Sequence, residues 1–265
     1  MNNQPIGILD SGVGGLSIWK EIVLHMPHES TVYIADSLNC PYGNKDKEEI
    51  YRLARKLVGF LVKNNAKLVI VACNTITVSC LGRLRLEFKN LPIVGAVPVV
   101  KTLVENTRNK KIGILSTTAT AKSEYQKELI KVFANKCEVV NIGMDKLVPL
   151  IEKGEIGGSE IKKILKDELN IFKNAGVDSL ALGCTHFPFL KKEIQNFLGL
   201  SVLVFDSGGA IARQVKRVLT NNDDLSLQKK PEYSFYTTGN TQLFTAVVKK
   251  LIGENFVKKA ERALL

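Results

Sequence analysis

The hydrophobic positions of the chain form short uninterrupted runs that are separated by longer amphipathic segments. Runs such as residues 6–9, 69–72 and 180–183 show no polar alternation, which is typical of parallel strands covered on both faces. Residues 50–61 instead place apolar side chains every three or four positions, which predicts a helix packed on a sheet. Strand-like runs alternating with helical segments predict an α/β fold.

The same pattern predicts further elements in order along the chain. We expect strands at residues 6–9, 32–35, 69–72, 93–97, 112–115, 138–142, 180–183, 202–205 and 233–237. We expect helices at residues 16–25, 50–61, 77–88, 99–105, 124–134, 147–152, 159–174, 191–198, 208–219 and 242–252. The hydroxyl-rich residues 116–123 predict a loop, and residues 258–265 predict a loosely held tail.

Three strand-like segments return later in the chain, in the same order and at nearly the same offset. The sequence Ile-Gly-Ile-Leu occurs at residues 6–9 and again at 112–115, and residues 92–95 have a counterpart of similar character at 200–203. The run that ends in Cys73 corresponds to the one that ends in Cys184. Such a repeat predicts two similar half-units and not a tandem solenoid.

The repeat leads to a division of the chain into domains. Pro98 follows a predicted strand and marks the crossing into the second half-unit. We expect residues 1–97 together with 208–265 to form the first α/β domain and residues 98–207 to form the second. The last predicted strand and helix, at residues 233–252, return to complete the first domain.

The composition is that of a globular protein and disfavours several other classes. Hydrophobic residues make up 45% of the 265 residues and charged residues 24%. No apolar run approaches the ~20 residues that a membrane helix needs, and the N-terminal residues lack a signal-peptide pattern. The five cysteines show no paired spacing, which argues against a disulfide framework. We therefore expect a cytoplasmic protein that is not bound to a membrane.

The net charge of +11 raises the question of nucleic-acid binding. The lysines lie beside acidic residues, as in residues 45–49 and 162–168, and no basic stripe with interleaved aromatic residues occurs. We expect a solvated lysine-rich surface and no specific nucleic-acid partner. No Cys-x-x-Cys motif or Cys/His cluster with zinc spacing occurs, so we expect no bound metal.

The candidate chemistry lies where two of the apolar runs stop. Cys73 and Cys184 each follow such a run and begin a polar tripeptide. The carboxyl ends of parallel strands are where open α/β sheets bind ligands. Each cysteine precedes a predicted helix N-terminus, which favours the thiolate and predicts a thiol pKa below the usual value of about 8.5. Asp10 and His186 are the candidate acid–base partners of Cys73 and Cys184, respectively.

Two thiols on opposite faces of one carbon atom would allow one to remove a proton and the other to return a proton from the far side. This exchange inverts a stereocentre, and backbone amides after each cysteine are suited to binding the α-carboxylate of an amino acid. Buried structural cysteines would explain neither the polar tripeptides nor the repeated setting. The pattern therefore favours a two-base amino-acid racemase.

Four segments of the chain resemble the signature segments of the glutamate racemases, within the aspartate/glutamate racemase superfamily. They are residues 10–17, 41–43, 72–75 and 182–188, and the resemblance extends in order and spacing over nearly the whole chain. It implies cofactor-independent interconversion of L- and D-glutamate, which supplies D-glutamate for peptidoglycan. It also implies a homodimer whose subunits each bind glutamate between two pseudo-symmetric α/β domains.

The resemblance implies roles for individual residues. Cys73 would take the proton from D-glutamate and Cys184 from L-glutamate, while Asp10 and His186 assist them. The residues expected to contact the substrate are Asp10, Ser11, Tyr42, Gly43, Asn74, Thr75, Thr185 and His186. Asp36 and Glu152 match acidic positions of the family near the site and are secondary catalytic candidates.

The chain also departs from the family pattern, and other functions stay open. The family often has an arginine and an aromatic residue before Pro-Tyr-Gly, where this chain has Asn39 and Cys40. Aspartate racemase or another amino-acid racemase of the superfamily is the nearest alternative, because one methylene is worth only about 1–3 kcal/mol of selectivity. A non-catalytic binding protein with a two-domain cleft would explain the duplication but not the two thiols.

Overall fold

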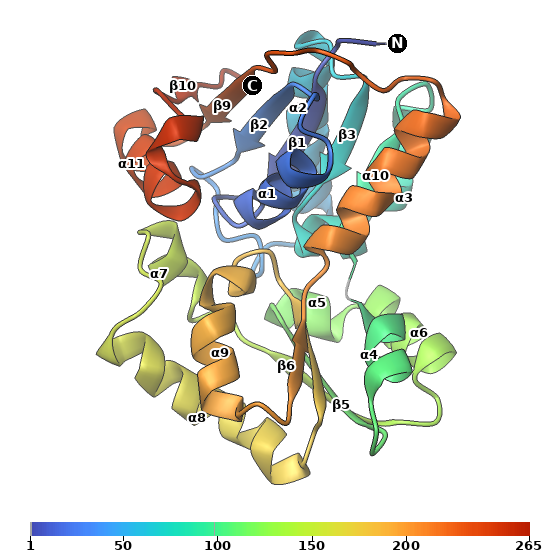
Figure 1. Cartoon of the computed structure of the whole chain (residues 1–265), viewed down its shortest axis with the longest axis vertical. Coiled ribbons are helices and arrows are strands. Elements are labelled where there is room, and N and C mark those ends of the chain that lie inside the picture. The colour runs from blue at the N-terminus through green and yellow to red at the C-terminus, as the bar shows by residue number, and fades with distance from the viewer. Residues whose placement is uncertain (1, 98) are drawn as a thin grey trace.

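The computed structural model describes residues 2–97 and 99–265 and contains two parallel sheets with helices around them (Figure 1). The first sheet consists of β1 (Ile6–Asp10), β2 (Thr31–Ala35), β3 (Leu68–Val71), β4 (Ile93–Gly95), β9 (Tyr233–Thr237) and β10 (Glu261–Arg262). The second consists of β5 (Lys111–Ser116), β6 (Glu138–Gly143), β7 (Ser179–Gly183) and β8 (Leu203–Phe205). The predicted α/β fold with two parallel sheets is confirmed.

The helices lie between these strands in the chain. They are α1 (Leu16–His25), α2 (Lys47–Lys63), α3 (Asn74–Glu87), α4 (Val100–Asn106), α5 (Thr118–Lys122), α6 (Glu124–Phe133), α7 (Val148–Glu152), α8 (Ser159–Ala175), α9 (Lys191–Leu198), α10 (Gly208–Asn221) and α11 (Thr241–Ile252). Two short 3₁₀ helices are η1 (Phe187–Leu190) and η2 (Glu254–Phe256). None of the helices in the described part of the chain has the length and apolar character needed to cross a membrane.

The two sheets share one strand order, as the sequence repeat predicts. The first sheet runs β10–β9–β2–β1–β3–β4 and the second runs β6–β5–β7–β8, so that β1 to β4 correspond to β5 to β8. The repeated Ile-Gly-Ile-Leu segments lie in β1 and β5, and the two cysteine-terminated runs are β3 and β7. Ile8 of β1 pairs with Ile70 of β3, and Ile114 of β5 pairs with Ala181 of β7. The two half-units are therefore pseudo-symmetric.

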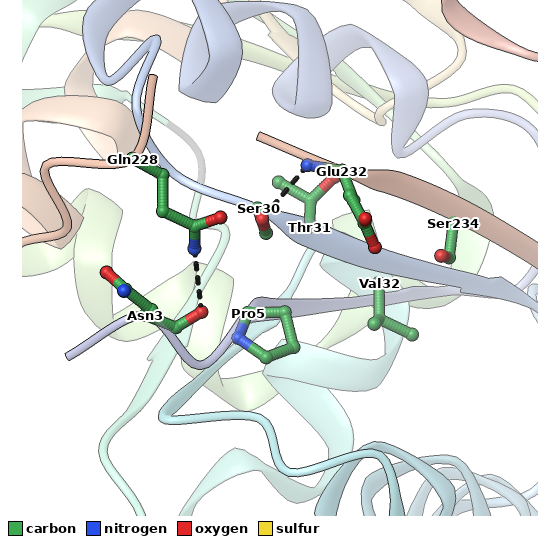
Figure 2. A pocket seen from close by; sticks show the side chains of 8 residues that line it. All are labelled: Asn3, Pro5, Ser30, Thr31, Val32, Gln228, Glu232 and Ser234. Atoms are coloured by element: carbon green, nitrogen blue, oxygen red, sulfur yellow. Dashed lines mark hydrogen bonds between the residues drawn. The ribbon is translucent and has the colours of Figure 1, made fainter. Parts of the chain in front are cut away.

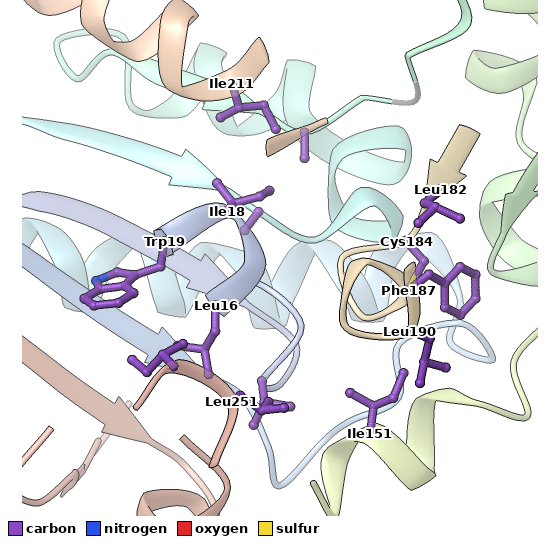
Figure 3. Close-up of a cluster of buried hydrophobic side chains, with 14 of the residues drawn as sticks. Leu16, Ile18, Trp19, Ile151, Leu182, Cys184, Phe187, Leu190, Ile211 and Leu251 are labelled. Atoms are coloured by element: carbon purple, nitrogen blue, oxygen red, sulfur yellow. The ribbon is translucent and has the colours of Figure 1, made fainter. Parts of the chain in front are cut away.

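A hydrophobic core connects the two halves of the molecule. One cluster of buried side chains includes Leu16 and Trp19 of α1 together with Leu182 and Phe187 of the second half. Figure 3 shows that Leu16 and Trp19 lie on α1, while Phe187 lies beside Cys184 after β7. Val13 of the turn after β1 belongs to the same cluster, so burial of apolar surface holds this turn within the shared core.

Three predictions about local structure are wrong. α3 begins at Asn74 and not at residue 77, so that Cys73 is itself the N-cap residue. The hydroxyl-rich segment expected to be a loop contains α5, whose first turn is capped by the side chain of Thr117. The expected loose tail adds β10 to the edge of the first sheet beside β9 and buries Ala260 and Ala263. The predicted crossing residue, Pro98, lies outside the described residues.

Candidate active site

Cys73 and Cys184 occupy equivalent places in the two half-units and line the same cavity. Cys73 follows β3 and Cys184 follows β7, and both side chains are buried. The cavity is also lined by each predicted substrate-binding residue except Asp10. Its volume is about 20 Å³, which is close to the space that a single water molecule occupies. A ligand of more than a few atoms needs more space than this.

The Cys73 side of the cavity is built from the end of β1 and the start of α3. The Cys73 thiol donates a hydrogen bond to Ser11 Oγ at 3.7 Å. Burial, together with the nearby charge of Asp10, raises the pKa of Cys73 to about 12. The expected lowering of the pKa of Cys73 is therefore wrong, because removal from water outweighs the effect of the helix N-terminus.

Asp10 connects the two halves and does not form a hydrogen bond with Cys73 in the structure. Its buried carboxylate accepts hydrogen bonds from the backbone N–H of Gly12 at 2.9 Å and from the Thr185 hydroxyl at 3.1 Å. Burial raises the pKa of Asp10 to about 6, although the charge of His186 opposes this rise. Asp10 thus acts on Cys73 through its charge and positions Thr185 by direct contact.

The Cys184 side contains a chain of polar contacts. His186 Nδ1 is 3.6 Å from Cys184 Sγ, and His186 Nε2 is 2.6 Å from Glu152 Oε1. Burial alone would lower the pKa of His186, but the hydrogen bonds to Cys184 and Glu152 outweigh it and raise the pKa well above its usual value. The imidazolium stabilises negative charge on the Cys184 sulfur by direct electrostatic attraction.

The setting of Cys184 differs from the expected helix N-terminus. The 3₁₀ helix η1 follows Cys184, and α9 begins only at Lys191. The positive charge beside Cys184 therefore comes from His186 and not from the dipole of a long helix. Glu152, a secondary candidate, holds the imidazole and also accepts a hydrogen bond from the Val13 N–H at 2.8 Å.

Two glycines in the turn after β1 allow this close approach of the halves. A Cβ atom at Gly12 would collide with the carboxylate of Glu152. A Cβ atom at Gly14 would lie 2.5 Å from His186 Nδ1 and from Thr185 Oγ1. The glycines of the Asp-Ser-Gly-Val-Gly-Gly segment are needed because any larger residue would displace the acid–base groups.

Asp36, the other secondary candidate, is held away from the cavity lining. Its buried carboxylate accepts hydrogen bonds from the Tyr42 hydroxyl at 2.5 Å and from the Thr238 hydroxyl at 2.6 Å. The side-chain amide of Asn39 donates to the same carboxylate at 3.0 Å. With these donors around it, Asp36 positions Tyr42 at the cavity and does not face the space between the thiols.

The cavity lining contains three residues that the sequence analysis did not assign to the site, Pro41, Thr117 and Val148. Thr117 Oγ1 lies 3.0 Å from Thr75 Oγ1, so that hydroxyl groups of the two halves meet. The signal for Thr117 was the hydroxyl-rich segment 116–123, which occupies the place of the glycine-rich turn in the first half. No comparable signal marks Val148.

A larger hollow lies at the opposite edge of the first sheet, near the amino ends of β1 and β2. It measures about 410 Å³ and includes Asn3, Thr31 and Glu232 in its lining. Figure 2 shows its wall, where the Gln228 side chain donates a hydrogen bond to the Asn3 carbonyl at 3.0 Å. None of the predicted site residues lines this hollow. The two candidate thiols lie at the cavity between the halves and not at this hollow.

Comparisons with known proteins agree with this arrangement. A glutamate racemase from Listeria monocytogenes serotype 4a is 37% identical over 248 residues, which cover 93% of each chain. The crystal structure of a glutamate racemase isoform from Bacillus anthracis superposes with a TM-score of 0.90 at 28% identity and covers 100% of this chain and 98% of that one. A glutamate racemase from Francisella tularensis in complex with D-glutamate superposes with a TM-score of 0.86 at 29% identity, with the same coverage.

The family model described as Asp/Glu/Hydantoin racemase matches residues 18–215. This match includes the strands and helices that carry both cysteines, His186 and Glu152. The paired strand orders, the two buried thiols and these similarities lead to one conclusion, that the chain belongs to the Asp/Glu/Hydantoin racemase family.

Proposed function

We propose that this protein interconverts L- and D-glutamate without a cofactor and so supplies D-glutamate for peptidoglycan. The observation that carries the proposal is the pair of buried thiols, Cys73 and Cys184, at equivalent strand ends on one cavity. The similarity to glutamate racemases along most of the chain supports glutamate as the substrate.

The reaction needs one thiolate and one thiol. With L-glutamate, the Cys184 thiolate takes the Cα proton, and the electrons of the broken C–H bond remain on the substrate as a carbanion stabilised by the α-carboxylate. The Cys73 thiol then gives its proton to the opposite face of Cα, which yields D-glutamate and a Cys73 thiolate. The reverse reaction uses the same groups in exchanged roles.

Charge stabilisation comes from groups around the two thiols. The backbone N–H groups of Asn74 and Thr75 begin α3 and are suited to binding the α-carboxylate as negative charge develops on it. His186, supported by Glu152, stabilises the Cys184 thiolate before the reaction and can buffer its proton afterwards. Ser11, Tyr42, Gly43 and Thr185 provide the remaining polar contacts to the substrate.

Further parts of the proposal concern the organisation of the protein. Residues 1–97 with 208–265 form one domain and residues 98–207 the other, a division supported by the membership of the two sheets. The two domains separate to admit glutamate into the small cavity. The protein works as a cytoplasmic homodimer, and its lysines form a solvated surface without a specific nucleic-acid partner.

The test is incubation of the reduced protein with L-glutamate, and separately with L-aspartate, in D₂O without added cofactor. Loss of optical rotation with deuterium entering Cα of glutamate is the expected result. The same result with aspartate alone would keep the mechanism and replace the substrate. Absence of exchange with both amino acids, from protein that is folded and reduced, would contradict the racemase proposal and favour a binding protein.

A further inference from the structure

Three side chains with metal-binding atoms meet beside the cavity, although they are far apart in the sequence. Cys40 lies in the loop after β2, Glu152 ends α7, and His186 follows β7. The Cys40 sulfur, a Glu152 carboxylate oxygen and a His186 ring nitrogen all lie within 4.8 Å of one another. His186 is buried, and Cys40 and Glu152 are half-buried. The cluster is thus partly shielded and still within reach of a small ion.

The geometry is close to that of a tetrahedral zinc site. Zinc bonds of about 2.0–2.3 Å to sulfur, nitrogen and oxygen place the ligand atoms about 3.3–3.8 Å from one another. The three donor atoms lie within 4.8 Å of one another, and the 2.6 Å contact between His186 Nε2 and Glu152 Oε1 would have to open to admit the ion. One thiolate, one imidazole and one carboxylate form a donor set that suits Zn²⁺ far better than Mg²⁺ or Ca²⁺, which prefer oxygen ligands alone.

The carboxylates near Cys40 attract a cation, and His186 must lose its proton before its ring nitrogen can bind one. Burial raises the pKa of the Cys40 thiol, and the negative charges of Glu152 and Asp10 raise it further. The same negative charges attract a divalent ion, which can displace the thiol proton on binding. No lysine or arginine is among the residues that line the neighbouring cavity. The overall charge of +11 therefore does not describe this part of the protein.

We propose that Cys40, Glu152 and His186 bind a thiophilic divalent cation such as Zn²⁺, and that binding switches off the reaction. His186 and Glu152 would then be ligands of the metal and would no longer stabilise the Cys184 thiolate. A fourth ligand position would be open to water. The inhibition rests on the proposed function, whereas the metal binding rests only on the three-donor cluster.

Cys40 is the residue that separates metal binding from catalysis. It does not line the cavity between the catalytic thiols, and it is not among the residues expected to contact glutamate. Replacing it with serine removes the sulfur ligand and leaves His186 and Glu152 in place. Cys137 offers a matched control, because it is also a half-buried free cysteine but lies just before β6, outside the cluster.

The experiment measures Zn²⁺ binding by equilibrium dialysis, with Co²⁺ as a spectroscopic probe, in the wild-type protein, Cys40→Ser and Cys137→Ser. We expect one tightly bound ion and a thiolate-to-cobalt charge-transfer band in the wild type and in Cys137→Ser. Cys40→Ser should bind zinc at least about 10-fold more weakly and lose the band. Equal affinity in all three proteins, or no binding to the wild type, would overturn the proposal.

A second measurement uses the wild-type protein and does not depend on a folded variant. Alkylation followed by peptide mass spectrometry should show that Zn²⁺ protects Cys40, while labelling of Cys137 is unchanged. In activity assays at a buffered free-zinc concentration, Zn²⁺ should inhibit the wild type but not Cys40→Ser, and chelation should restore activity. Zinc binding through Cys40 in a protein without racemase activity would refute the proposed function and leave the metal site standing.

Discussion

The two halves of the active site share one strand order but use different chemistry around the thiol. Cys73 begins the long helix α3 and has the neutral hydroxyl of Ser11 as its hydrogen-bond partner. Cys184 precedes only a 3₁₀ turn and contacts His186, which Glu152 holds from the other side. The duplicated fold therefore supplies the placement of both thiols, while each half gives its thiol different polar neighbours.

This difference bears on which thiol holds the proton. Burial and Asp10 favour the protonated form of Cys73, and the imidazolium of His186 lies beside Cys184. On the proposed mechanism the form with a protonated Cys73 reacts with L-glutamate. Racemisation has an equilibrium constant of unity, so kcat/KM is equal in the two directions at every pH. The asymmetry must therefore be found in kcat and KM taken separately.

Removing one thiol at a time should have the largest effect. Cys73→Ser and Cys184→Ser should each lose racemisation by about 10²–10⁴-fold, because one proton transfer loses its acid–base group. Cys73→Ser should still exchange the Cα hydrogen of L-glutamate in D₂O without loss of optical rotation, and Cys184→Ser should do the same with D-glutamate. NMR of Cα deuterium measures this, and exchange of the opposite enantiomer would reverse the assigned roles.

Glu152→Gln tests whether the negative charge of Glu152 keeps His186 protonated beside Cys184. The amide still accepts from Val13 and His186, but the negative charge is lost, so the pKa of His186 should fall. We expect kcat to drop by about 10–10²-fold and the alkaline limb of its pH profile to move to lower pH. Glu155→Gln, an exposed change in the loop after α7, is the control. An unshifted profile would show that Glu152 only packs against the site.

Asp10→Asn should lower kcat and raise the free energy of unfolding. Between pH 4 and 6 the unfolded carboxyl has lost its proton while folded Asp10, whose pKa is about 6, retains it. The free energy of unfolding therefore falls as the pH rises through this range, by up to about 3 kcal/mol. Asp10→Asn should recover this amount at pH 7 and almost none at pH 4, with about 10-fold lower kcat. Urea unfolding measures the gain.

The control for that experiment is Asp167→Asn, which changes an exposed carboxylate on α8. It should alter the free energy of unfolding by less than about 0.5 kcal/mol. If Asp10→Asn raises the free energy of unfolding equally at pH 4 and pH 7, the buried charge of Asp10 is not the cause of the increase.

Ser11→Ala should have the smallest effect of the series. It removes the 3.7 Å contact of the Cys73 thiol, a weak hydrogen bond, and leaves the thiol itself in place. We expect kcat with D-glutamate to fall by about 2-fold to 10-fold. Steady-state kinetics in both directions provide the measurement, and Ser234→Ala at the distant hollow is the matched control. A loss as large as that of Cys73→Ser would give Ser11 a direct part in proton transfer.

Local patterns in the sequence are sufficient to predict β1 to β9, though not the short edge strand β10, and also the repeat and the meeting of the two cysteines. Apolar runs and their polar endings depend on nearby residues, and parallel strands bring their carboxyl ends to one edge whatever lies between them. Cys73 and Cys184 could therefore be placed on one cavity from the sequence.

Features that depend on packing between distant segments could not be predicted in this way. The raised pKa of Cys73 reflects its depth of burial, and the contact between Glu152 and His186 depends on how the halves meet. One lysine departs from the general expectation of a solvated surface, because Lys67 forms a buried ion pair with Glu29. Cys40 shows no metal-site spacing, because its partners in the cluster come from other parts of the chain.

The cavity measures only about 20 Å³, and this bears on how the two thiols recover their starting protonation state after each turnover. On the proposed mechanism, a molecule that has just produced D-glutamate carries its thiolate on Cys73 and is prepared only for D-glutamate. On the proposed opening of the two domains, Cys73 recovers its proton in the open form. This return of the proton is a step of the proposed cycle that added substrate does not accelerate.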